Sequence, residues 1–391
     1  MAIVERTSTS WFSRIGGALT GALFGLALLI GAIVALFWNE GRSVATYQSL
    51  QEGLAAVVST NAAKVDPALE GKLIHIQSKV MPNADAADPE TGITGPGAVG
   101  MVRHVEMYQW VETESTKTEK KLGGSEEEVK TYSYQKEWSD VAVASSQFKQ
   151  PQEEVNPEFW LPSSTTYVDA AMLGAFNLPG EKLAQVAALK THPISADEAD
   201  AASEALGYPG EGRAVNGALY FGENENAPEI GDTKITFEEM ILPEASVVGM
   251  QNGTSISEYT TKNQNSLFLL DAGLKSAKVM FASGEDENAT LTWVIRAGGI
   301  VALFVGFILI FRVLSVLGDV IPIVGSMIGF ATGLVSFVLA LVVGGIVIAI
   351  GWLFVRPLLS ITLIIGAGAI AFAYFKYGRK KNGPADRLKT I

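Results

Sequence analysis

Residues 15–38 read Ile-Gly-Gly-Ala-Leu-Thr-Gly-Ala-Leu-Phe-Gly-Leu-Ala-Leu-Leu-Ile-Gly-Ala-Ile-Val-Ala-Leu-Phe-Trp, without a charged side chain. At about 1.5 Å per residue, a helix of this length crosses a hydrocarbon core of about 30 Å. An aromatic pair ends the run and polar residues follow at once, which is typical of a membrane interface. The run is too long for a signal peptide and no small-x-small cleavage site follows it, so we expect a retained transmembrane helix over residues 15–38.

Three further apolar segments lie in the last hundred residues, and we predict transmembrane helices over residues 297–317, 323–355 and 358–375. Pro322 and the Arg356-Pro357 pair separate them, because proline interrupts a helix and restricts the residue before it. Arg312 to Pro322 is predicted to be a short turn at the membrane surface opposite the large central segment. The segment 323–355 exceeds the length of one span, so it forms either one tilted helix or an interfacial segment followed by a helix.

The charges predict an orientation for these four spans. The whole chain has a net charge of −12. Residues 1–38 have a net charge of +1 and residues 297–391 of +6, so the segment 39–296 must have a net charge of −19. Basic residues concentrate in the tail 376–391, and the positive-inside rule therefore places this tail and residues 1–14 in the cytoplasm. The acidic segment 39–296 is then extracytoplasmic, and its charge argues against nucleic acid as a partner.

The segment 39–296 is predicted to be a β-rich domain, which gives an α+β membrane protein as the fold class. Alternating patterns over 101–111 and 132–138 predict a long antiparallel hairpin, and 72–80, 165–176, 214–222, 232–237 and 245–251 are further strand candidates. Residues 181–190 and 195–206 are predicted helices, the second with a capping box at Ser195 and Glu198. We expect a twisted antiparallel sheet or partial barrel with helices packed on it.

Residues able to support catalysis or bind a metal are few in this sequence. The chain has no cysteine, and His75, His104 and His192 lack the paired spacing of a metal site. The sequence contains no phosphate-binding loop, nucleophile elbow or His-Glu-x-x-His helix. We therefore expect no catalytic residue, no metal and no cofactor, and predict that the protein is not an enzyme.

Polar residues at the ends of the spans are the candidate site residues: Asn39, Glu40, Arg42, Arg312, Asp319 and Arg356. By topology Glu40, Arg42 and Arg356 lie near the outer surface. We hypothesise that Glu40 pairs with Arg356 and ties the first span to the turn after the third, the alternative being that each side chain simply faces the headgroups.

Two sets of glycines at four-residue spacing are candidates for close helix packing. They are Gly17, Gly21 and Gly25 in the first span and Gly325, Gly329 and Gly333 in the third. Either they pack inside the protein, the interpretation we favour, or they mediate self-association. The repeated spacing makes the first and third spans natural neighbours.

Five motifs together resemble the LUMA family, also called the transmembrane protein 43 family. They are Phe37–Arg42, Val105–Trp110, Tyr134–Trp138, Asn288–Trp293 and Gly351–Leu358. The resemblance implies four spans with a large lumenal domain. It also implies an association with the endoplasmic reticulum and inner nuclear membrane, where animal members of the family are thought to organise protein complexes.

These patterns favour a multi-pass membrane scaffold that organises membrane complexes and maintains membrane or envelope structure by self-association. The expected partners are membrane lipids, a second copy of the chain and other membrane or extracytoplasmic proteins. The alternatives are an envelope stress or signalling component, or an enzyme or lipid-binding protein with its site in the extracytoplasmic domain. The Ala- and Gly-rich, Cys-free composition favours a bacterial inner-membrane protein with a periplasmic domain over one in the endoplasmic reticulum or inner nuclear membrane.

Overall fold

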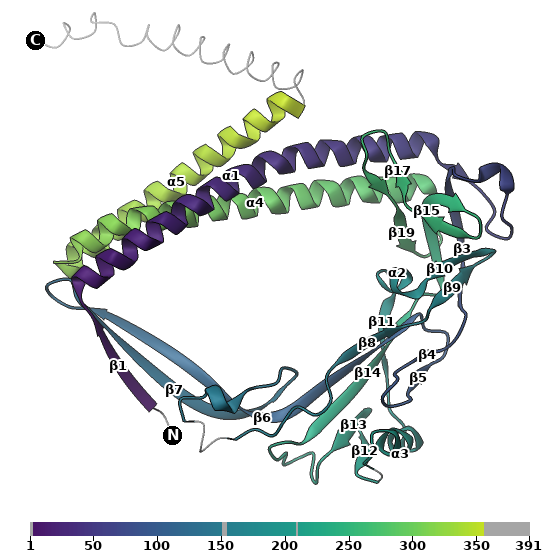
Figure 1. Ribbon diagram of the computed structural model, residues 1–391, viewed down its shortest axis with the longest axis horizontal. Helices are drawn as coiled ribbons and strands as arrows, with labels where there is room; N and C mark the ends of the chain where they lie inside the picture. Colours follow the sequence, from purple (N-terminus) through teal and green to yellow (C-terminus); the bar gives the residue numbers. More distant parts are fainter. Residues whose placement is uncertain (1–2, 151–154, 209, 356–391) are drawn as a thin grey trace, which may run out of the picture. The chain divides into compact units, whose positions relative to one another are not determined.

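A computed structural model describes residues 3–150, 155–208 and 210–355 (Figure 1). The chain divides into two compact units. Among the described residues, a β unit comprises those of Met1–Thr7, Ser49–Thr118 and Glu128–Glu285, and a helical unit comprises those of Ser8–Gln48, Glu119–Glu127 and 286–355. Residues 39–48 and 286–296, at the two ends of the predicted domain, are helical and group with the helical unit.

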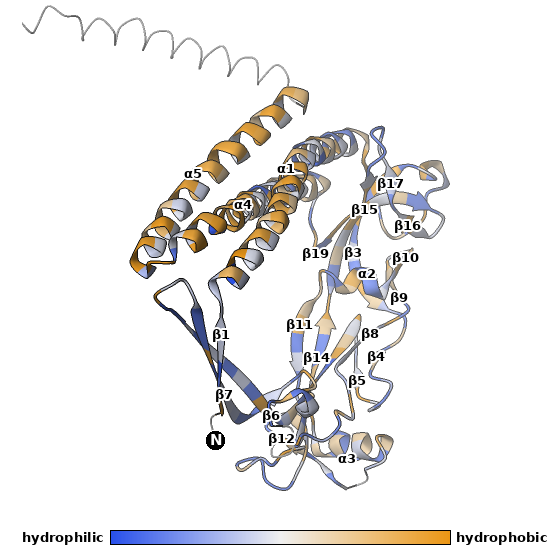
Figure 2. Ribbon diagram, turned by 60° about the vertical axis from the view of Figure 1, so that its left-hand side comes forward, coloured by the Kyte–Doolittle hydropathy of each residue, from blue (hydrophilic) through white to orange (hydrophobic). Residues whose placement is uncertain are grey.

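Three long helices lie side by side in the helical unit: α1 (Trp11–Ala56), α4 (Ala277–Gly318) and α5 (Pro322–Val355). Each has an apolar stretch long enough to cross a membrane, and Figure 2 shows their hydrophobic colouring against the more polar strands. The predicted spans are confirmed as helices, and the segment 323–355 is one helix. Arg312 lies inside α4, so the turn predicted from that residue begins only after Gly318. The predicted fourth span, 358–375, lies outside the described residues.

The three helices pack through small and branched side chains. Leu29, Leu36 and Leu303 are buried in a core that also includes Ala340 and Val347 of α5. At Gly25 the backbones of α1 and α4 approach so closely that a Cβ would lie 2.7 Å from the carbonyl oxygen of Gly306. Because lipid tails are as apolar as the helices, such close backbone contact is what holds membrane helices together.

An eight-stranded sheet forms the larger part of the β structure. Its main path runs β1 (Ile3–Thr9), β7 (Glu126–Ser139), β6 (Gly100–Lys120), β14 (Thr233–Ile241), β13 (Ala218–Phe221) and β12 (Gly212–Val215); β8 (Ser164–Tyr167) pairs with β6 and β11 (Ala188–His192) with β14. β6 and β7 are the predicted long hairpin. Along β14, buried and partly exposed residues alternate, as the two-residue period of a strand requires.

A second sheet closes on itself to form a small barrel. β3 (Leu73–Pro82), β9 (Ala170–Leu173), β10 (Phe176–Pro179), β16 (Ser255–Ser257) and β15 (Glu244–Asn252) pair in that order, and β15 pairs back to β3 through seven residue pairs from Glu244↔Lys79 to Met250↔Leu73. β19 (Leu269–Ala272) extends the sheet at β15 and β2 (Val58–Ser59) at β3. Closure leaves the ring strands few unpaired edges.

Shorter elements connect these sheets. The helices are α2 (Gly180–Ala184), α3 (Ala196–Ala205), η1 (Pro67–Leu69) and η2 (Ser145–Gln147); the strands are β4 (Ala86–Ala87), β5 (Thr94–Gly95), β17 (Tyr259–Thr260) and β18 (Ser266–Leu267). The predicted capping box is confirmed, since Ser195 accepts a hydrogen bond from the Glu198 amide and the Glu198 side chain accepts one from the Ser195 amide.

Three predicted elements are wrong in the β unit. The strand over 165–176 is instead two short strands, β8 and β9, followed by a turn in which Gly174 has a φ of 65°. The helix over 181–190 ends at Ala184, and Ala188–His192 instead pairs with the open edge of β14, so sheet pairing overrides helix propensity there. The strand over 214–222 is part of a hairpin whose turn, Asn216-Gly217, has φ values of 51° and 81°. Asn-Gly is the preferred pair for such a turn, so the signal was present in the sequence.

A buried ion pair fixes a loop onto the β unit. The Arg103 side chain is fully buried, and its Nη1 lies 2.6 Å from both carboxylate oxygens of Asp88 and 2.8 Å from Glu90 Oε2. Its Nη2 also donates to the carbonyl oxygen of Pro162 at 3.1 Å. Asp88 Oδ1 also accepts hydrogen bonds from the amide and the hydroxyl of Thr91. The Asp88 carboxylate therefore holds both the Arg103 guanidinium and the turn from Asp88 to Thr91.

We predict that Arg103→Met destabilises the protein by about 3–5 kcal/mol, because Asp88 is then left as a buried, unpaired charge. Adding Asp88→Asn removes that charge and should restore part of the loss. Urea unfolding of the detergent-solubilised protein, followed by tryptophan fluorescence, measures both variants. A double variant no more stable than Arg103→Met alone would contradict this account of the pair.

Candidate functional site

Polar side chains from all three long helices meet in the helical unit, in what we call the polar layer: Asn39, Glu40, Arg42, Asn288, Thr292, Arg296 and Trp352. At its centre, Arg296 donates from Nε and Nη2 to the two oxygens of Glu40, each at 2.7 Å. Trp352 Nε1 donates to Glu40 Oε2 at 2.8 Å. Glu40 is only 3% exposed, so these three donors replace the water that a carboxylate would otherwise require.

The other half of the polar layer is built from uncharged partners around Arg42. Its Nη1 donates to Asn288 Oδ1 at 3.0 Å, its Nη2 to Thr292 Oγ1 at 3.0 Å, and its Nε and Nη2 both to Asn39 Oδ1. Asn39 also donates through Nδ2 to the Thr292 carbonyl oxygen at 3.1 Å. Each polar group of α1 here is therefore matched by one on α4.

Close packing and aromatic rings enclose the charged pair. The guanidinium of Arg296 lies 4.8 Å from the ring centre of Trp293 and 5.7 Å from that of Trp352. A Cβ at Gly351 would lie 2.8 Å from Glu40 Cγ, so glycine at this position allows α5 to approach the carboxylate. The layer contains donors, acceptors and one compensated ion pair, which suits it to fixing the positions of the helices.

Glu40 therefore pairs with Arg296 and Trp352 in the described structure, and the hypothesised partner Arg356 lies outside the described residues. Sequence reasoning missed Arg296, Asn288 and Thr292 as members of this site. Asn288 and Thr292 lie within a motif that carries the family resemblance and are four residues apart, on one helical face, which was the available signal.

A second polar group, the hairpin-tip cluster, joins the β6–β7 tip to the other end of the helices. It consists of Arg14, Lys120, Glu126 and Asp319. Arg14 pairs with Asp319 and, through Nε at 2.7 Å, with Glu126, and Lys120 Nζ lies 2.8 Å from Asp319 Oδ1. Asp319 is fully buried. The Gly123 amide also donates to the carbonyl oxygen of Val320 at 3.1 Å.

The charges in the sequence predict that Arg14 and Asp319 lie on the cytoplasmic side and the central segment on the opposite side of the membrane, and this orientation stays a prediction.

The remaining candidate residues are dispersed. Arg312 is exposed on α4. In the first glycine set, Gly21 and Gly25 face Leu309 of α4. In the second set, Gly325 faces Asp319, just after α4, and Gly329 faces Ser315 of α4. Gly17 and Gly333 have open space where a Cβ would lie. The two glycine sets thus do not meet each other, although α1 and α5 do touch through the rings of Phe37 and Phe354, 5.8 Å apart.

The histidines of the β unit have separate surroundings. His75 is buried, with ring nitrogens 3.1 Å from Ser59 Oγ and 2.9 Å from the Lys275 carbonyl oxygen, and His104 lies 2.9 Å from Glu238. His192 lies between Glu239 at 2.7 Å and Glu198 at 3.0 Å. Burial alone would lower the pKa of His192, but its hydrogen bonds with these carboxylates raise it above the usual value. Among the described residues no group of three or more His, Asp or Glu side chains is arranged to hold a metal ion.

Comparison with known proteins identifies the family of this chain. The sequence profile of the family described as "Transmembrane protein 43" matches residues 107–357. A rat protein named "Transmembrane protein 43" is 31% identical over 365 residues, covering 90% of this chain and 89% of its own. The chain belongs to the transmembrane protein 43 family.

Other relatives extend this relationship across animals. The human "Transmembrane protein 43" is 30% identical over 92% of this chain and 90% of its own length. A Drosophila melanogaster "Transmembrane protein 43 homolog" is 27% identical over 90% of this chain and 93% of its own. These relatives are eukaryotic, so they give no support to the predicted bacterial location. No solved structure matches the chain.

We predict that Arg296→Met destabilises the protein by about 3–5 kcal/mol, because Glu40 loses its charged partner while buried. Glu40→Gln in the same chain should recover part of that loss, whereas Arg312→Gln, which changes an exposed charge on the same helix, should have little effect. Thermal unfolding in detergent measures all variants, and additive losses for Arg296→Met and Glu40→Gln would exclude the coupling.

A second prediction concerns pH. Because the folded-state pKa of His192 is raised, its interaction with Glu198 and Glu239 stabilises the protein fully below the unfolded pKa of about 6.5 and is lost as pH rises through the folded-state value. The wild type should therefore melt at a higher temperature than His192→Gln. This difference should be largest near pH 6 and should shrink toward pH 9. A difference in melting temperature that stays constant from pH 6 to pH 9 would contradict this account.

Proposed function

We propose that the protein is a membrane scaffold that self-associates through its helices and displays the β unit to partners in the lumen of the endoplasmic reticulum or nuclear envelope. Family membership supports the multi-pass architecture, and the animal relatives support the lumenal placement over a periplasmic one. The acidic surface of the β unit suits partners with basic faces.

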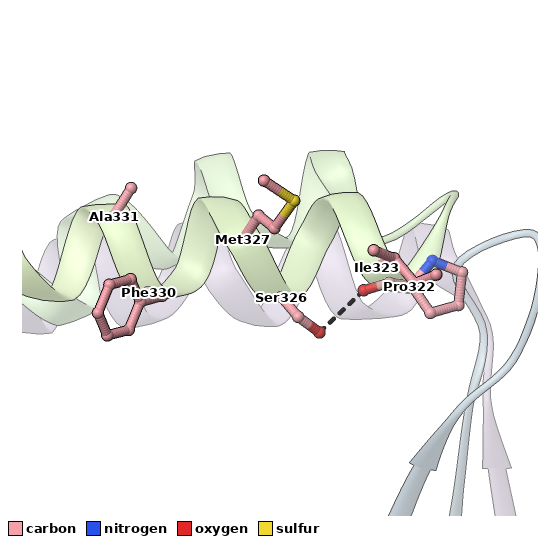
Figure 3. Close-up of a pocket in the computed structure, with 6 residues that line it drawn as sticks. All are labelled: Pro322, Ile323, Ser326, Met327, Phe330 and Ala331. Carbon is pink, nitrogen blue, oxygen red and sulfur yellow. Dashed lines mark hydrogen bonds between the residues drawn. The ribbon is translucent and has the colours of Figure 1, made fainter.

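The observation that carries self-association is an open apolar face at the start of α5 (Figure 3). A hollow of about 670 Å³ lies over six residues: Pro322, Ile323, Ser326, Met327, Phe330 and Ala331. Ile323, Met327 and Phe330 are 68–80% exposed, whereas Ser326 and Ala331 are small. Large side chains beside small ones let a second helix place its own side chains between them, as helix pairs in membranes do.

The polar atom in this hollow is already satisfied. The Ser326 hydroxyl donates to the Pro322 carbonyl oxygen at 2.9 Å, within the same helix (Figure 3). A partner helix therefore need not supply a hydrogen-bond acceptor for Ser326, and van der Waals packing between the two helices decides whether it binds. The most direct partner is the same face of a second copy, since a twofold interface needs only one self-complementary surface.

The test is the mass of the intact protein in lipid discs with native lipids retained. We predict a discrete oligomer for the wild type and a shift toward monomer for Ala331→Leu, because the added side chain fills the hollow. Ala349→Leu is the matched control, the same change at an exposed position of α5 outside the hollow. A monomeric wild type, or an Ala331→Leu variant that assembles like the wild type, would refute self-association through this face.

A further inference from the structure

An apolar groove of about 670 Å³ runs between α1 and α5 and reaches the polar layer at the Arg42 side chain. Its walls are Ile33, Val34, Phe37, Trp38, Gly41 and Ala45 of α1 and Val347, Ile350 and Phe354 of α5, with Arg42 as the charged member. Its volume lies in the range of sites that bind small molecules. The groove lies on helices of one compact unit, within the membrane-embedded part of the chain.

Arg42 differs from the other arginine of the polar layer in its partners. Arg296 is neutralised by Glu40, whereas the hydrogen-bond partners of Arg42 are the uncharged groups of Asn39, Asn288 and Thr292. Within the described part of the chain, Arg42 has no carboxylate within 4 Å. A guanidinium held by neutral acceptors keeps its full positive charge, and four of its five N–H donors bind these partners.

We propose that this groove binds an anionic phospholipid, with the phosphate at Arg42 and an acyl chain along the apolar walls. Both halves of the site match this one class of ligand. Arginine binds phosphate oxygens through charge-assisted hydrogen bonds, and the walls offer only hydrocarbon and aromatic surface. The polar layer positions the guanidinium from behind, because Asn39, Asn288 and Thr292 hold it through fixed helices.

The surroundings favour an anion over a neutral headgroup. Glu40 is two residues from Arg42 but is only 3% exposed and bound by Arg296 and Trp352, so its charge is compensated where the lipid binds. Trp38, which lines the groove, is 59% exposed, and tryptophan at a span end is typical of the headgroup region. The phosphate and its cation are thereby placed at the depth where lipid phosphates lie.

Two substitutions test the charge of Arg42 and the open volume of the groove separately. Arg42→Gln removes the cation. Gly41→Leu leaves Arg42 in place and fills the groove, and the site of its Cβ has no atom within 4 Å, so α1 accepts the side chain without a clash. Arg312→Gln is the matched control, the same loss of charge at an exposed position of α4 that does not line the groove. Melting temperatures in detergent establish that each variant is folded.

The experiment incubates each purified protein with mixed micelles of phosphatidylglycerol and phosphatidylcholine that share the same acyl chains, and native mass spectrometry counts the retained lipids. We expect the wild type and Arg312→Gln to retain one phosphatidylglycerol per chain. Arg42→Gln should reduce that retention about tenfold, the loss of one charge-assisted hydrogen bond, and Gly41→Leu by a similar factor. Added glycerol phosphate should not compete, because it lacks an acyl chain.

Three results would overturn the proposal. The first is equal retention of the two lipids by the wild type. The second is unchanged phosphatidylglycerol retention in a folded Arg42→Gln or Gly41→Leu variant. The third comes from a photoreactive amino acid at Ile350, which lines the groove: cross-links to protein, either to residues 356–391 or to a second copy, in place of cross-links to lipid would assign the groove to another occupant.

Discussion

The buried ion pair between Glu40 and Arg296 is the constraint on which the helical unit depends. A carboxylate that is 3% exposed at the end of an apolar span is stable only with its donors in place. Those donors come from α4 and α5, so a single side chain of α1 fixes the positions of both other helices. The close approach at Gly351 and the rings around Arg296 follow from that arrangement.

The five motifs that carry the family resemblance converge on two places in the structure. Phe37–Arg42, Asn288–Trp293 and the described part of Gly351–Leu358 meet in the polar layer. Val105–Trp110 and Tyr134–Trp138 lie on the paired strands β6 and β7, where the rings of Tyr108 and Trp138 lie 5.4 Å apart and Lys136 lies over Trp110. Motifs far apart in sequence thus describe one polar contact between helices and one aromatic face of a hairpin.

Hydrophobic length and periodicity were sufficient to predict the three described membrane helices and the long hairpin, and the spacing of Ser195 and Glu198 was sufficient to predict the capping box. These features depend on neighbours in sequence. The pairing of Glu40 with Arg296 could not be predicted this way, because Arg296 lies on another helix and only packing brings the two side chains together. The strand at Ala188–His192 was missed for the same reason, since the open edge of β14 decides its conformation. The Asn216-Gly217 pair was a local signal for a hairpin turn, but the apolar pattern of residues 214–222 favoured the prediction of one continuous strand.

Closure of the small barrel also determines the order in which the chain can fold. The pair Ile76↔Val247 joins β3 to β15 across roughly 170 residues, and at about 5–20 residues per second the ribosome needs roughly 10 to 30 s to make them. During that interval Leu73, Ile74 and Ile76, buried in the finished protein, have no β15 to cover them. After the first membrane helix has been made, β3 is therefore a segment at which the nascent chain is exposed to aggregation and which a chaperone can protect.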